Sequence, residues 1–243
     1  MYNYQILIEY DGTNFFGWQY QNNKRTVQGE IQDALKKINK DKDVKIIGSG
    51  RTDTGVHAIS QSANFQIEKE WDLNKLKMAI NGNLSNDVRI FHCQKKPKNF
   101  HARFSAKKRK YIYKCFLGNS VINRGFTWEI SEKISISSLN DCAKYLNGKI
   151  DFSTFSKNNP EIKNRFCNIC SCEWINNYPF YTFEIEADRF LHHLVRNLVG
   201  TMIKVAENII TKNYFIDLLN NQINNPKIFK APSHGLYLKK VSY

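Results

Sequence analysis

One segment of eleven residues, 48–58, brings a carboxylate, a guanidinium and an imidazole together. It reads GSGRTDTGVHA, and its three glycines allow tight turns and a close approach of the backbone. Asp53 follows Arg51 by two residues, and a nearby opposite charge keeps a carboxylate ionised at neutral pH. An ionised carboxylate can serve as a nucleophile or as a base, so Asp53 is our candidate nucleophile. The alternative is a simple turn in which Asp53 caps backbone N–H groups.

A second segment, 107–114, interleaves cations with aromatic rings and reads KKRKYIYK. Cations neutralise phosphates and aromatic rings stack on bases, so this pattern is typical of nucleic-acid binding. The basic side chains that we expect to bind substrate are Lys107, Lys108, Arg109 and Lys110. The alternation of Tyr111, Tyr113 and Cys115 is also typical of one packed face of a strand.

The remaining patterns argue against a metal or a nucleotide cofactor. Cys167, Cys170 and Cys172 lie within six residues of one another, but a fourth ligand with zinc-site spacing is lacking. We therefore expect these thiols to pack within a strand. The histidines do not form a ligand motif such as HxxxH, and neither GxGxxG nor GxxxxGK occurs. We expect no metal and no cofactor.

The composition indicates a globular protein with an anionic partner. The chain of 243 residues has 36 Lys and Arg against 22 Asp and Glu, which gives a net charge of +14 and a pI near 9.4. Nucleic acid is the leading candidate partner for such an excess. No apolar run is long enough to span a membrane, and the N-terminus lacks a signal-peptide pattern. We expect a cytoplasmic protein with free thiols and no membrane partner.

The spacing of apolar residues predicts the elements that position these segments. In the first half we expect strands at 4–10, 44–47, 61–67 and 88–93, and helices at 27–39 and 73–84. In the second half we expect strands at 110–117, 170–175, 181–187 and 236–243, and helices at 136–146, 190–206 and 209–222. Thr26 precedes the first helix, and Glu30 lies close to capping-box spacing from it. The 48–58 segment thus joins two strands.

This order of elements predicts an α+β fold with two similar α/β halves, 1–105 and 106–243. The β-α-β-β-α-β order is RRM-like and is typical of small nucleic-acid-binding sheets. We expect the antiparallel sheets of the two halves to adjoin around a central basic cleft. The first half would carry the Asp53 loop, and the second half would carry the strand with Tyr111 and the helix with Arg196.

The helix predicted at 190–206 carries one cation at the edge of a broad apolar face. His192, Arg196 and Gly200 follow one another at intervals of four, so they would lie along one line of the helix. A cation in such a place usually extends its head to water or pairs with a carboxylate.

The 48–58 segment resembles the active-site loop of the TruA-type tRNA pseudouridine synthases, whose pattern is GxGRTDxGVHA. Further segments match the same family in the same order along nearly the whole chain. They are Tyr10–Phe15, Gly17–Gln19, Thr26–Glu30, Phe100–Ala106, Phe190–His193, Val195–Gly200, Ala231–Pro232 and His234–Leu238. Residues 84–87, Leu-Ser-Asn-Asp, depart from the Leu-Pro usual in relatives and are expected to be peripheral to the chemistry.

The resemblance implies a role for each matching residue. Asp53 would be the catalytic aspartate, and Arg51 beside it would help to hold the place of the extruded nucleotide. Tyr111 would stack on the target base and transfer a proton. Arg196 would pair with the catalytic aspartate, and Leu236 would pack against the base. Further substrate contacts are expected from Thr52 and His57.

The implied reaction isomerises uridine by breaking its N1 glycosidic bond, rotating the base and joining C5 to the sugar. The carboxylate would add either to C1′ of the ribose or to C6 of the ring, and both routes stay open. The resemblance also implies a homodimer that acts on tRNA at positions 38, 39 and 40 of the anticodon stem-loop. The alternatives are a non-catalytic RNA-binding module and a pseudouridine synthase that acts on another RNA.

Overall fold

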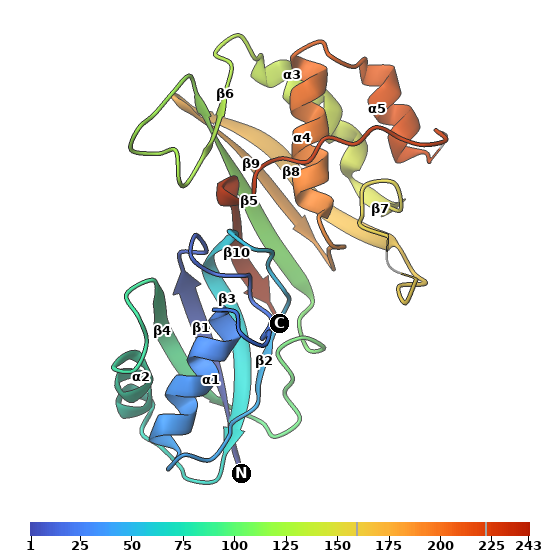
Figure 1. The fold of residues 1–243 in the computed structure, drawn as a ribbon. Helices are drawn as coiled ribbons and strands as arrows, with labels where there is room; N and C mark the ends of the chain where they lie inside the picture. The colour runs from blue at the N-terminus through green and yellow to red at the C-terminus, as the bar shows by residue number, and fades with distance from the viewer. Residues whose placement is uncertain (159, 222) are drawn as a thin grey trace. The chain divides into compact units, whose positions relative to one another are not determined.

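The computed structural model describes residues 1–158, 160–221 and 223–243. The chain forms two compact units, which we call unit 1 (residues 1–107 with 237–243) and unit 2 (residues 108–236) (Figure 1). Both units combine helices with a mostly antiparallel sheet, so the α+β class predicted from the sequence is confirmed. The functional halves expected at 1–105 and 106–243 stay a prediction. Among the described residues, no helix is both long and apolar enough to cross a membrane.

Unit 1 is a sheet with two helices on one face (Figure 1). Its elements are β1 (Tyr2–Tyr10), α1 (Val27–Ile38), β2 (Ile46–Gly48), β3 (His57–Ile67), α2 (Leu73–Asn81), β4 (Val88–Lys96) and β10 (Leu236–Ser242). The strand order is β4-β1-β3-β10, with β2 also paired to β3. β1 runs antiparallel to both β3 and β4, and β10 pairs with β3 in parallel at Tyr237 and Leu238. Because β2 and β3 are antiparallel neighbours, the connection between them lies at the shared end of these two strands.

Unit 2 combines β-strands with three α-helices among its described residues. Its strands are β5 (Lys108–Leu117), β6 (Trp128–Ile130), β7 (Gly148–Asp151), β8 (Phe166–Asn177) and β9 (Phe180–Ala187). Its helices are α3 (Ile136–Ala143), α4 (Leu194–Ala206) and α5 (Lys212–Leu219), with 3₁₀ turns at Lys144–Leu146 and Ser233–Gly235. The strand order is β5-β9-β8-β7, with β6 beside β5. Helix α3 packs on β8, α4 packs on α3, and α5 packs on α4.

Helix α4 begins later than its sequence pattern predicts. We expected a helix over 190–206, but the structure starts it at Leu194. His193 has a φ of 69°, in the left-handed region, which cannot continue a right-handed helix. His192 therefore precedes the helix, and its predicted alignment with Arg196 and Gly200 is wrong. The sequence predicted a helix over 190–193 because this loop also contains a buried apolar residue, Leu191, which continues the apolar spacing of the helix.

Two other differences concern the ends and lengths of elements. The helix expected at 209–222 is confirmed over Lys212–Leu219, and Gln222 lies outside the described residues. Strands β6 and β7, of three and four residues, were not predicted. Runs this short hold too few residues to show a period of two.

Helix α1 begins where the sequence predicts because its first turn is capped. Thr26 lies in extended conformation, and its buried Oγ1 accepts a hydrogen bond from the Gly29 N–H at 3.2 Å. This bond satisfies one of the N–H groups that an α-helix leaves unpaired at its start. Glu30, expected near a capping box, instead binds Arg25 and Ser85.

We predict that Thr26→Ala lowers the free energy of unfolding by about 1 to 2 kcal/mol, because the cap is lost inside the fold. Thr26→Ser keeps the acceptor oxygen and should lose less than half as much. Urea denaturation of both variants measures the difference. Equal losses would show that the Thr26 methyl group, and not the cap, provides the stability.

Candidate active site

The Asp53 loop, residues 49–56, connects β2 to β3 in unit 1. Its start is tied to β3, where the Ser49 N–H donates to the Ser62 carbonyl at 2.7 Å and Gln61 Nε2 donates to the Gly50 carbonyl at 3.1 Å. Asp53 itself is half-buried, and its carbonyl accepts from the Val56 N–H at 3.1 Å. Asp53 is thus the first residue of a turn that ends at Val56, and Arg51 two residues earlier is exposed.

A second loop, which connects β1 to α1, is hydrogen-bonded to the Asp53 loop. The Trp18 N–H donates to the Thr52 carbonyl at 3.1 Å, and the Gly55 N–H donates to the Phe15 carbonyl at 3.3 Å. The hydroxyls of Thr52 and Tyr10 share a buried hydrogen bond of 2.8 Å. Backbone contacts on both sides of Asp53 therefore leave the loop little freedom to move.

Two glycines allow these loops to approach so closely. A Cβ on Gly12 would lie 2.1 Å from the Val56 carbonyl oxygen, and a Cβ on Gly17 would lie 2.5 Å from the Thr52 carbonyl oxygen. Gly17 also has a φ of +82°, which other residues adopt at a cost. The sequence shows the two glycines, but not that they face the Asp53 loop. Their roles were missed because the contact joins segments about 40 residues apart.

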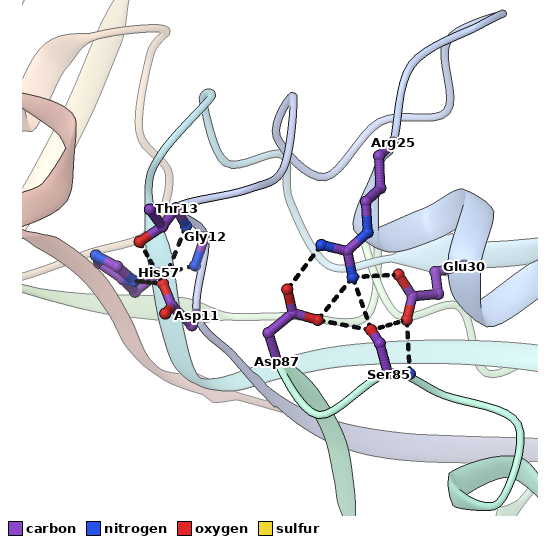
Figure 2. Close-up of polar contacts among 8 residues, drawn as sticks. All are labelled: Asp11, Gly12, Thr13, Arg25, Glu30, His57, Ser85 and Asp87. Atoms are coloured by element: carbon purple, nitrogen blue, oxygen red, sulfur yellow. Dashed lines mark hydrogen bonds and ion pairs between the residues drawn. The ribbon is translucent and has the colours of Figure 1, made fainter. Parts of the chain in front are cut away.

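His57 lies under the loop at the start of β3 and is only 2% exposed. Its Nδ1 lies 3.0 Å from the Gly12 nitrogen and 3.1 Å from Asp11 Oδ1, which also accepts from Thr13 (Figure 2). The ring stacks on Tyr237 with centroids 4.7 Å apart. A ring nitrogen carries either a lone pair or a proton, so Nδ1 either accepts from Gly12 or donates to Asp11.

Thr52 and His57 are both buried within unit 1 and bonded to other parts of it. Their observed contacts position the Asp53 loop. The substrate contacts expected of these two residues stay a prediction.

Arg25 joins three segments of unit 1 through one guanidinium (Figure 2). It forms a two-bond ion pair with Asp87, at 2.7 Å for each bond, and its Nη2 also donates to Glu30 at 2.8 Å and to Ser85 at 2.7 Å. The guanidinium lies 4.0 Å from the ring centroid of Phe15. The hydrogen bonds from Arg25 lower the pKa of the Asp87 carboxyl, and the pKa of Arg25 is raised in turn.

The Arg25 cluster gives a supporting role to residues 84–87, and the expectation that they are peripheral to the chemistry stays a prediction. Ser85 and Asp87 brace the β1–α1 loop through Arg25, because Arg25 is at the end of that loop and contacts Phe15 within it. Ion pairing across 62 residues leaves no local sequence pattern that could have indicated it.

Of the other expected site residues, Lys107 belongs to unit 1 and the rest lie in unit 2. Tyr111 is on β5 opposite Ile185, is 9% exposed, and meets the Phe190 ring edge-on at 5.0 Å. This contact sets the orientation of its ring. Leu236, the last residue of unit 2 and the first of β10, is 6% exposed.

Arg196 lies on the first turns of α4 and is anchored to the chain that follows α5. Its Nε donates to the Ala231 carbonyl at 2.8 Å, and its own carbonyl accepts from the Ala231 N–H at 3.0 Å. Gly200, one turn later, allows this approach, since a Cβ there would lie 2.2 Å from the Phe229 carbonyl oxygen. The guanidinium is thereby held at a fixed place at the edge of the apolar core.

The basic residues of 107–110 have contacts of their own along the strands. Lys108 pairs with Glu186 at 3.3 Å and Lys110 pairs with Glu184 at 2.5 Å, both across the β5–β9 ladder. Arg109 donates to the Asp188 carbonyl at 2.9 Å, and Lys107 is exposed. Ion pairs at the surface contribute little to stability and can exchange with phosphate, so the RNA-binding role of these cations stays a prediction.

The three cysteines of 167–172 lie on β8. Burial raises the pKa of the Cys167 and Cys172 thiols to about 11, so both are protonated at neutral pH. Cys172 Sγ donates to the Ala143 carbonyl at 3.2 Å, whereas Cys170 is exposed. The expected strand packing is confirmed for Cys167, which is fully buried.

Comparison with known proteins shows a full-length likeness. A family model described as tRNA pseudouridine synthase matches residues 6–105 and 142–243. A tRNA pseudouridine synthase A of Aquifex aeolicus is 37% identical over 245 residues, covering 99% of each chain. Proteins of the same name from Thermoanaerobacter sp. and Borreliella burgdorferi are 37% and 40% identical, covering 100% and 97% of each chain.

We predict that Gly17→Ala lowers the free energy of unfolding by about 2 to 4 kcal/mol, because it adds left-handed strain and a backbone overlap with Thr52. Gly50→Ala is the matched control, since a Cβ on Gly50 meets nothing within 4 Å. That variant should change stability by less than about 0.5 kcal/mol. Urea denaturation measures both, and similar losses would contradict the close contact between the loops.

We predict that Arg25→Ala lowers the free energy of unfolding by about 1 to 2 kcal/mol at pH 7, a value discounted for partial exposure of the cluster. The lowered pKa of Asp87 means that its contribution is present above the usual carboxyl range and is lost as the pH falls through that range. Arg25→Ala should therefore destabilise less in acid than at pH 7.

Thermal denaturation between pH 2 and pH 7 measures this dependence. Lys36→Ala is the control, because it breaks an exposed ion pair between α1 and Asp43 in the segment after that helix, and it should be close to wild type. A loss for Arg25→Ala that is the same at every pH would contradict the assigned cause.

Proposed function

Because the chain belongs to the tRNA pseudouridine synthase family, we propose that it isomerises uridine to pseudouridine at positions 38, 39 and 40 in the anticodon stem-loop of tRNA. The observation that carries the proposal is the Asp53 loop, because it combines the family's motif with a carboxylate held by backbone contacts on both sides. A nucleophile held in place avoids much of the entropy cost of reaching its target.

Asp53 acts as the nucleophile of this reaction. Its carboxylate bonds to C1′ of the ribose or to C6 of the base, and the N1–C1′ bond breaks in the course of the reaction. After the base rotates, C5 bonds to C1′, the bond to Asp53 breaks, and the proton lost from C5 is balanced by one gained at N1. The product is an isomer of the substrate, so no oxidant, reductant or energy source is consumed.

Four further residues are assigned roles on the same uridine. Tyr111 stacks on the base and moves the C5 proton, and its edge-on contact with Phe190 supports a fixed ring orientation. Arg196 orients the Asp53 carboxylate, and its anchor at Ala231 supports a fixed position. Leu236 packs against the base, and the exposed Arg51 occupies the place left by the nucleotide.

The binding of RNA follows from charge. Neutralising phosphates releases counterions, and a net charge of +14 favours this binding at low salt. A paired uridine must leave its helix before Asp53 can reach it, which costs a few kcal/mol that backbone contacts can supply. Two RRM-like halves around a basic cleft, a homodimer and a cytoplasmic location remain predictions that belong to this proposal.

Two other functions are tested against this one. A non-catalytic module would bind tRNA through the same basic residues, with the Asp53 loop as a mere turn. A pseudouridine synthase for another RNA would keep the chemistry and change the target. The names of the relatives favour tRNA modification over both.

We predict that Asp53→Asn abolishes pseudouridine formation, a loss of at least about a thousandfold, while tRNA binding stays within about twofold of wild type. The variant keeps the shape of the side chain and removes its charge. An unmodified tRNA transcript is incubated with protein, and pseudouridine is mapped by carbodiimide-dependent primer-extension stops. Asp33→Asn, an exposed change on α1, is the control and should retain full activity.

The outcomes separate the three functions. Stops that persist with Asp53→Asn would overturn the assignment of the nucleophile. Tight tRNA binding without stops for the wild-type protein would favour the non-catalytic module. Stops in another RNA, and none in tRNA, would favour the third function.

A further inference from the structure

Phe104 is one of the most exposed large apolar side chains of unit 1, at 77%. It lies in the connection between β4 and β5, outside the Asp53 loop. An isolated apolar residue at a surface is ordinary and needs no function. Three further observations on its neighbours point to a binding role for Phe104.

The backbone around Phe104 is held firmly. The Ala102 N–H donates to Asn64 Oδ1 at 2.8 Å, and the Ala102 carbonyl accepts from the Tyr243 hydroxyl at 3.0 Å. The Ser105 N–H donates to the His101 carbonyl at 2.9 Å, which closes a turn around Phe104. The ring is therefore presented to solvent by a fixed turn, and its binding to a partner would cost little ordering entropy.

The Phe104 ring is also part of a stack. His101 lies against it with centroids 4.3 Å apart and planes inclined by 29°, and the Arg103 guanidinium lies 5.6 Å from its centroid. His101 Nδ1 accepts from the N–H groups of Arg103 and Phe104, at 3.2 Å each, which fixes the orientation of the imidazole. We call these three side chains, His101, Arg103 and Phe104, the Phe104 platform.

The charged residues near the Phe104 platform in the sequence are all basic. Residues 88–107 include six Lys and Arg and no Asp or Glu, in a chain that has 22 acidic residues. Lys95 pairs with Glu70 of the same unit, and Lys96 lies over the Phe100 ring at 5.2 Å. The segment thus offers cations to phosphates next to an exposed aromatic face, a combination typical of proteins that bind single-stranded nucleic acid.

We propose that the Phe104 platform is a second base-binding site, on which an unpaired base of the bound RNA stacks outside the reacting uridine. The base lies on the Phe104 ring, which His101 supports, and Arg103 contacts the neighbouring phosphate. Stacking requires a base that is free of its helix, so the ligand is a looped or flipped nucleotide. This inference rests on the proposed function, since it takes RNA as the partner.

The test compares Phe104→Ala, Phe104→Leu and Phe104→Tyr in the full-length protein. Affinity for an unmodified tRNA transcript is measured by filter binding at several salt concentrations. Phe104→Ala should bind at least about fivefold more weakly, the lower end for the loss of one stacked base. Phe104→Leu keeps apolar area without an aromatic face and should be as weak as Phe104→Ala, whereas Phe104→Tyr should bind like wild type.

The salt dependence separates stacking from charge. Phe104→Ala should leave the slope of log K against log salt unchanged, whereas Arg103→Ala should reduce that slope by up to about 1. Phe91→Ala, a change of another exposed phenylalanine on β4 of the same unit, is the matched control and should bind like wild type.

Each contrary result overturns the proposal. Equal tRNA affinities of Phe104→Ala and Phe91→Ala would show that Phe104 is not a base-binding site. Wild-type affinity of Phe104→Leu would show that apolar contact, and not stacking, provides the binding. If the wild-type protein forms pseudouridine and Phe104→Ala binds tRNA as tightly as wild type, this inference is overturned and the proposed function stands. A wild-type protein that neither binds nor modifies tRNA would overturn both.

Discussion

The hydrogen bond from the Trp18 N–H to the Thr52 carbonyl is the contact on which the position of Asp53 depends. It joins the β1–α1 loop to the residue directly before the candidate nucleophile. A Cβ on Gly17 would lie 2.5 Å from that carbonyl oxygen, so the close approach needs a glycine there. A separate bond between the Thr52 and Tyr10 hydroxyls also holds Thr52. A short side chain such as that of Asp53 has few rotatable bonds, so fixing the backbone beside it largely fixes the carboxylate.

Charged groups act in two different ways in this protein. In unit 1 the Arg25 cluster uses one guanidinium to hold three segments, and that arrangement supports the loop that contacts Thr52. In unit 2 Lys108 and Lys110 lie in cross-strand pairs with Glu186 and Glu184. Each of these lysines is balanced by a glutamate, so the net charge of +14 is an excess carried by other cations of the chain, and that excess favours binding to phosphates.

The sequence by itself determined the elements with strong periodicity and the chemistry of the Asp53 loop. Helix α1 was predicted to within a residue at either end, because its apolar spacing and the Thr26 cap are both local signals. The strand β5 that carries Tyr111 was located in the same way, from alternation along 110–117. The motif from Gly48 to Ala58 indicated the family, because a motif consists of residue types and their spacing along the chain, which can be read without knowing the fold.

Only the tertiary structure decided which distant residues support that motif. The sequence could not show that Gly17 faces Thr52, or that Arg25 pairs with Asp87, since both contacts join segments far apart in the chain. It also extended helix α4 over His193, because apolar spacing is the same in a helix and in a loop that folds back on the core. Local patterns record the conformation that neighbouring residues favour, whereas contacts across the fold depend on how the sheet brings its loops together.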